Sequence, residues 1–169
     1  MHTTDFARAF GALFAIMNPF VSLPIFLSLT AGRPAEEMRR AALATTLYSA
    51  VMCAVVAVAG TTILGFFGVT VDDFRLAGGL VLLLIGLGML NGQESTAHRR
   101  TPEERAGQHG MDDIAFYPMA FPMIVGPGTI TTLVIFFGQA HSTAEYLAVI
   151  VAAALVLLAL GVVLFFAPA

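Results

Sequence analysis

Two apolar stretches of the sequence combine proline and glycine in a pattern that is unusual for a continuous helix. The first reads NPFVSLP and carries Pro19 and Pro24, and the second reads FPMIVGPGT and carries Pro122 and Pro127. Proline removes a backbone donor and disrupts the helix around it. A helix that restarts after such a break presents free N–H groups and a partial positive charge, which bind anions such as a carboxylate. The chemistry predicted is therefore non-covalent binding of a small polar or zwitterionic solute.

The residues around these breaks define the candidate site. We expect a half-helix up to about Val125, a break at Gly126, and a second half-helix from about Pro127, because proline suits the first helical position. In the first stretch Asn18 and Ser22 are expected to supply caps around the prolines. The predicted substrate-binding residues are Asn18, Pro19, Ser22, Pro24, Gly126, Pro127, Gly128 and Thr129. Thr45, Thr46 and Tyr48 could face the same region, but the sequence does not distinguish them from helix-packing residues.

The sequence carries no catalytic or metal-binding set that we can identify. The long apolar runs contain no Asp, Glu, Arg or Lys, so a buried carboxylate relay is not expected. There is no His-Glu-x-x-His motif, and the single cysteine, Cys53, is expected to act as a small buried hydrophobe. We therefore expect neither an enzyme nor a cofactor, and leave Na⁺ or H⁺ open as a coupling ion.

Composition places the elements that carry these residues in a lipid bilayer. Hydrophobic residues make up 58% of the 169 residues, charged residues 11%, and the mean hydropathy is +0.87. Soluble domains have roughly 25% charged residues. The net charge of −3 and the lack of a basic run argue against a nucleic-acid partner. A membrane helix needs about 20 mostly apolar residues. Five spans are predicted from the uncharged runs 9–32, 41–71, 76–93, 114–144 and 146–169.

Arginine placement predicts the orientation of these spans. The first and third connections hold six arginines: Arg33, Arg39, Arg40, Arg99, Arg100 and Arg105. The N-terminus and the other two connections hold only Arg8 and Arg75. The positive-inside rule then places the 1–2 and 3–4 loops in the cytoplasm and the N-terminus in the periplasm.

The two proline motifs also indicate an internal repeat. Pro19 and Pro122 are 103 residues apart, and the same offset places the second apolar run on the fifth. A repeat of three spans is inverted relative to its copy, as in many secondary transporters. We predict an all-α polytopic membrane helix bundle, a 3+3 inverted repeat with broken first and fourth helices. The single membrane domain, 1–169, comprises repeat 1 (about 6–93), a cytoplasmic linker (about 94–113) and an incomplete repeat 2 (about 114–169), with a sixth helix expected to be absent.

These stretches resemble the MarC family of integral membrane proteins. The resemblance is carried by NPFVSLPIF, by FPMIVGPGTIT and by the glycine-rich run AGGLVLLLIGLGML between them, and it covers essentially the whole chain. It implies a bacterial inner-membrane protein with six spans that is similar to transporters of small neutral amino acids. The matching positions are Asn18, Pro19, Pro24, Gly126, Pro127 and Gly128, and the resemblance implies no catalytic residue.

Three functions are weighed on these observations. The favoured hypothesis is a secondary transporter of small neutral amino acids, with its site near mid-membrane between the two broken helices. A non-transporting membrane scaffold or stress protein is the alternative, in which the breaks only shape helix packing. A drug efflux pump is less favoured, because the sequence has no Trp and the motif glycines favour a small site. The expected partners are a small-molecule substrate and the lipid bilayer, and a homo-oligomer is left open.

Overall fold

The computed structural model describes residues 2–90 and 114–168, and this part of the chain is helical with short connections. The elements, in chain order, are α1 (His2–Met17), α2 (Pro19–Leu29), α3 (Ala35–Phe66), α4 (Val71–Leu90), the π-helical segment η2 (Ala115–Ile124), α7 (Pro127–Gln139) and α8 (Thr143–Phe165). The predicted linker, 94–113, lies outside the described residues.

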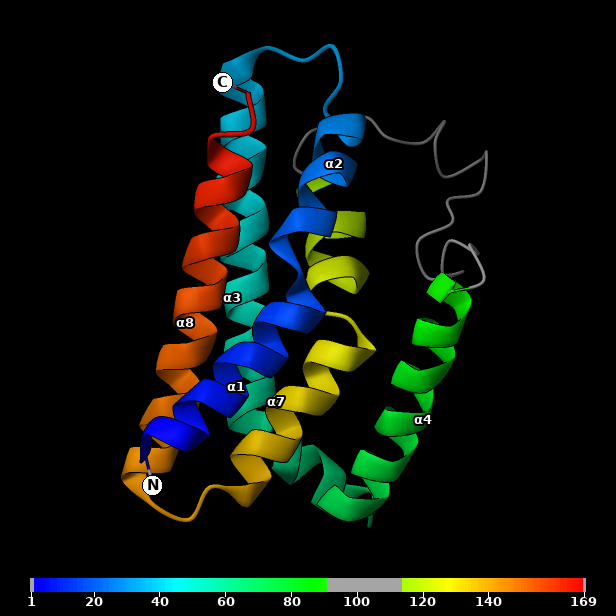
Figure 1. Cartoon of the computed structure of the whole chain (residues 1–169), viewed down its shortest axis with the longest axis vertical. Helices are drawn as coiled ribbons and strands as arrows, with labels where there is room; N and C mark the ends of the chain where they lie inside the picture. Colours follow the sequence, from blue (N-terminus) through cyan, green and yellow to red (C-terminus); the bar gives the residue numbers. More distant parts are fainter. Residues whose placement is uncertain (1, 91–113, 169) are drawn as a thin grey trace.

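The helices run alternately up and down, as Figure 1 shows. α1 and α2 ascend together, α3 descends and α4 ascends, whereas η2 and α7 descend together before α8 ascends. The broken pair η2–α7 therefore runs opposite to the broken pair α1–α2, and α8 runs opposite to α3. This is the arrangement that the inverted repeat predicts for the described elements. The all-helical bundle with broken first and fourth helices is confirmed.

Within the described residues, three helical stretches are long and apolar enough to cross a membrane: Asp5–Leu29, Ala35–Phe66 and Thr143–Phe165. A fourth is added if Ala115–Ile124 and Pro127–Gln139, which are bent by 56° at their break, count as one span. The predicted span at 76–93 extends past the end of α4 at Leu90 into residues that are not described, so it stays a prediction.

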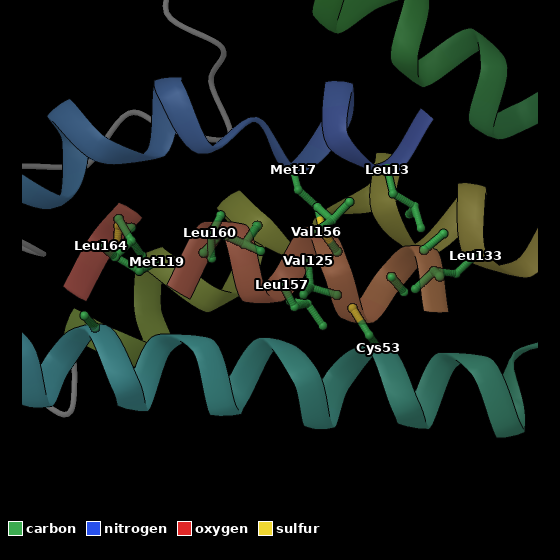
Figure 2. Packing of buried hydrophobic residues seen from close by; sticks show 14 of the residues in the cluster. Leu13, Met17, Cys53, Met119, Val125, Leu133, Val156, Leu157, Leu160 and Leu164 are labelled. Carbon is green, nitrogen blue, oxygen red and sulfur yellow. The ribbon is translucent and has the colours of Figure 1, made fainter. Parts of the chain in front are cut away.

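The core is formed where one face of each long helix meets its neighbours. On α1 the buried residues recur every fourth position, at Ala9, Leu13 and Met17, which places them on one face. They pack with the buried face of α8, which includes Val156 and Leu160 (Figure 2). The opposite faces of α3 and α8 are also apolar but exposed, as expected for helices that contact lipid tails. The exposed residues on these faces include Leu47, Val51, Val55, Val58, Leu147, Val151, Leu158 and Val162.

Glycines allow α4 to approach α7 closely. A Cβ added at Gly78 would overlap the side chain of Thr131, and one added at Gly138 would lie 2.9 Å from a methyl group of Val71. Small residues at helix contacts are the usual means of close packing in membranes. The small size of Gly78 thus allows α4 to pack closely against Thr131 of α7.

The start of α4 is secured by a reciprocal cap. The backbone N–H of Thr70 donates to Asp73 Oδ2 at 3.1 Å, and the backbone N–H of Asp73 donates to Thr70 Oγ1 at 3.1 Å. This is the geometry of a capping box. The Thr70 hydrogen bonds lower the pKa of the exposed Asp73 carboxyl, and so favour its charged form at the positive end of the helix.

Candidate functional site: the two helix breaks

The first break lies between α1 and α2, at Asn18. This residue has φ 35° and ψ 83°, a left-handed conformation that asparagine tolerates better than most residues. Its Oδ1 accepts a hydrogen bond from the Val21 N–H at 3.3 Å, and Pro19 occupies the first helical position of α2. The sequence therefore folds locally as expected: an asparagine cap followed by proline restarts the helix.

The second break lies between η2 and α7. Val125, with φ −105° and ψ 63°, ends η2, and Gly126 is extended before Pro127 begins α7. The predicted break near Val125 and the restart at Pro127 are confirmed, but the half-helix before the break is interrupted by the non-helical dihedrals of Tyr117 and Phe121. No side chain caps the N-terminus of α7, in contrast to that of α2.

Gly126 is required at this break for a steric reason. A Cβ at this position would overlap the carbonyl oxygen of Pro122. The backbone of Gly126 itself, with φ −91° and ψ −174°, is one that any residue adopts. The requirement for glycine therefore comes from the close approach of Pro122 and not from the backbone dihedrals.

A hydroxyl group bridges each break in the same way. The Ser22 hydroxyl donates to the Met17 carbonyl oxygen at 3.2 Å, and the Thr129 hydroxyl donates to that of Ile124 at 2.6 Å. In both cases the donor lies five residues after the acceptor and on the other side of the break. These bonds satisfy carbonyl groups that would otherwise be unpaired in an apolar environment. Ser22 lies within α2, so its predicted role as a cap is wrong, and the bond across the break is what it supplies.

The structure brings most of the predicted site residues to the two breaks, but not all. Both breaks lie near mid-height of the bundle (Figure 1), with α1 in contact with α7 and α2 in contact with η2. The buried members are Pro19, Ser22, Gly126, Gly128 and Thr129, and Asn18 is half-buried. Pro127 begins α7 at the second break but is exposed.

Pro24 is the exception among the predicted residues. It lies inside α2 and is exposed, and the helix continues through it to Leu29. A half-helix therefore starts at the first proline of the first motif and at the second proline of the second motif, and the backbone is also non-helical at Phe121, just before Pro122. Pro19 and Pro127, which both open half-helices, are 108 residues apart, so the offset of 103 that aligns the motifs does not align the breaks.

Two further polar residues were not assigned to the site by sequence reasoning. Thr45 and Ser49 on α3 are fully buried, and among the described residues their hydroxyl oxygens have no hydrogen-bond partner. The neighbouring Thr46 donates its hydroxyl to the Ala42 carbonyl oxygen at 2.8 Å, the usual arrangement within a helix. Nothing in the sequence separates Thr45 from Thr46, because the difference depends on which helix faces which side of α3.

The comparisons with known proteins agree with this architecture. A family described as MarC family integral membrane protein matches residues 3–169. The chain belongs to this family. It is 38% identical over 157 residues to a UPF0056 membrane protein of Methanocaldococcus jannaschii, covering 93% of this chain and 74% of that protein.

Other relatives of the MarC-family chain come from distant organisms. It is 34% identical over 137 residues to a UPF0056 membrane protein of Aquifex aeolicus, which covers 81% of this chain and 64% of the relative. The UPF0056 membrane protein YhcE of Escherichia coli is 30% identical over 148 residues, covering 88% of this chain and 68% of that protein. No solved structure matches. The chain is thus an integral membrane protein of the MarC family with several candidate spans.

Proposed function

We propose that this MarC-family protein is an inner-membrane secondary transporter of small neutral amino acids or similar small polar solutes. The observation that carries the proposal is the N-terminus of α7, which lies at mid-height of the bundle, is buried at Gly126, Gly128 and Thr129, and has no side-chain cap. The N–H groups of Gly128 and Thr129 lie in its first turn, where a carboxylate is stabilised by hydrogen bonds and by the helix dipole.

The lining of the break favours a small and neutral solute. Gly128 brings no side chain, so a ligand can approach the backbone there, whereas the space beside Gly126 is taken by the Pro122 carbonyl oxygen. The described residues that are fully buried include no Asp, Glu, Arg or Lys, so a side-chain charge on the ligand would have no partner. A zwitterion with a short side chain satisfies both conditions. The proposal involves no chemical step and no cofactor, and leaves Na⁺ or H⁺ as the driving ion.

Charges at the two ends of the bundle support an orientation for this transporter. Arg33, Arg39 and Arg40 lie at the end where α2 passes into α3. Acidic residues predominate at the other end: Asp5, Asp72, Asp73 and Glu145. With positive charge inside, the N-terminus is periplasmic and the 1–2 and 3–4 loops are cytoplasmic.

Counterflow of labelled alanine and glycine in proteoliposomes tests the proposal. We expect exchange by the wild-type full-length protein and its loss in Gly126→Leu, because the leucine side chain would occupy the break. Gly65→Leu is the matched control, since Gly65 is exposed on α3 and an added Cβ there meets nothing within 4 Å. Both variants are first shown to be monodisperse by size-exclusion chromatography.

One observation favours the scaffold alternative. The Ser22 and Thr129 hydroxyls already donate to the Met17 and Ile124 carbonyl oxygens across the breaks, as expected if the breaks only shape helix packing. If well-folded protein exchanges no neutral amino acid under imposed Na⁺ or pH gradients, the transporter proposal fails. The paired breaks would then be explained by packing alone. Exchange that persists in Gly126→Leu would instead refute the location of the site.

A further inference from the structure

We propose that Thr45 and Ser49 on α3, together with backbone carbonyls of η2, form a binding site for a Na⁺ ion inside the bundle. This site does not rest on the proposed transport of amino acids, because ion binding can be measured with no solute present.

The two hydroxyls share one face of α3. Residues four apart in a helix lie one above the other, so Thr45, Ser49 and Cys53 form a single row. All three are buried. Figure 2 shows Cys53 directed toward the layer that contains Val125 and Leu157. The hydroxyls one and two turns before Cys53 therefore face the same interior region, between η2 and α8.

The row formed by Thr45, Ser49 and Cys53 belongs to a helix, α3, that packs against η2. The rings of Tyr48 and Phe116 meet edge to face with centroids 5.7 Å apart, which sets the level of η2 against α3. On the α8 side, a Cβ at Gly161 would lie 3.0 Å from the side chain of Thr46. Ser49, the residue after Tyr48, therefore lies at the level where α3 meets η2.

The segment η2 has backbone carbonyl oxygens that could act as ligands. It contains Pro118 and Pro122, which have no backbone N–H, and its residues Tyr117 and Phe121 have extended, non-helical dihedrals. The segment therefore has more carbonyl acceptors than N–H donors. Unwound carbonyls of this kind, near the middle of a membrane, are a recurring source of ligands for Na⁺.

The two hydroxyl oxygens have no partner among the described residues, although each is fully buried. A buried hydroxyl without a hydrogen bond costs about 1–3 kcal/mol. Elsewhere in the bundle buried hydroxyls have a partner: the Thr30 hydroxyl, for example, donates to the Phe26 carbonyl oxygen at 2.8 Å. Two adjacent exceptions on one face indicate a ligand that accepts electron pairs from oxygen.

The chemistry of the ligand set selects the ion. Hydroxyl and carbonyl oxygens are hard, neutral ligands that suit a hard cation. The fully buried residues described here supply no carboxylate, so a divalent ion would keep most of its charge uncompensated. Met119 and Leu160, which lie in the layer that faces α3 in Figure 2, are fully buried, and this close packing favours a small ion. A monovalent ion of the size of Na⁺ meets these conditions better than K⁺.

Thermal unfolding of the purified full-length protein in detergent tests the site, in NaCl, KCl or choline chloride at equal ionic strength. A ligand at 100 times its dissociation constant raises Tm by about 5–10 °C in a protein of this size. We expect a saturable rise in NaCl only. Binding of radiolabelled Na⁺ to the same protein, with and without excess K⁺, gives a second measurement that does not depend on Tm.

The variants Thr45→Val and Ser49→Ala should lose the response to NaCl. In choline chloride they should be as stable as the wild type or more so, because each removes an unsatisfied buried hydroxyl. Thr46→Val is the matched control, since the Thr46 hydroxyl is satisfied within its own helix and this variant should keep the response. The Na⁺ site would be overturned if all three salts stabilise the protein equally, or if Thr45→Val and Ser49→Ala keep the NaCl response. The two hydroxyls would then bind a water molecule or pack without any ligand.

Discussion

Replacing Gly126 with alanine should destabilise the bundle, although it adds only a methyl group. The added Cβ overlaps the Pro122 carbonyl oxygen, which is part of the backbone and cannot rotate away. Overpacking of this kind costs typically about 1–3 kcal/mol, and each 1.4 kcal/mol is about tenfold in the unfolding equilibrium. We therefore expect roughly a 5- to 150-fold increase in the unfolded fraction. The cost is steric alone, because alanine adopts the backbone dihedrals of Gly126 without strain.

Reversible unfolding in mixed SDS and mild detergent, followed by circular dichroism, measures this difference. Gly65→Ala is the control, since its added Cβ meets nothing within 4 Å and alanine is favoured over glycine in a helix by up to about 1 kcal/mol. The two Gly→Ala variants should therefore shift stability in opposite directions. If Gly126→Ala is as stable as the wild type, the close approach of Pro122 to the break is not a feature of the folded protein, and the steric argument is refuted.

Three further predictions concern other parts of the bundle. Gly78→Leu should lower stability, because the leucine side chain would meet Thr131. Gly79→Leu is the control and should not lower it, because an added Cβ there meets nothing within 4 Å. Equal effects of the two variants in SDS unfolding would contradict the α4–α7 contact. Pro24→Ala should keep or raise stability in the same assay, because an exposed proline inside a helix is unfavourable by up to about 3 kcal/mol relative to alanine. A clear loss of stability in this variant would argue for a role of Pro24 in the break. Cys53, the only cysteine, is 5% exposed and should react with a maleimide slowly in the folded protein and rapidly after denaturation; fast labelling of the folded form would show that the α3 face is open.

Much of the candidate site could be predicted because its causes are local. A proline lacks its N–H wherever the helix packs, so Pro19, Pro24 and Pro127 are candidate breaks in any arrangement of the chain. The same reasoning is wrong at Pro24, where α2 continues, because one lost hydrogen bond at an exposed position does not by itself end a helix. Local rules therefore named the candidate breaks but did not decide which prolines break the helix.

The sequence alone determined the all-helical membrane bundle, its alternating directions and the break at Val125 and Gly126. These features follow from hydrophobic run length, from the lipid solvent, and from proline and glycine chemistry, all of which are properties of short segments. Only the tertiary structure decided that Gly126 faces the Pro122 carbonyl and that Thr45 and Ser49 lack a partner while Thr46 has one. The reason is physical: a contact between groups, or its absence, depends on which faces of separate helices meet, and residue order within each helix does not specify that.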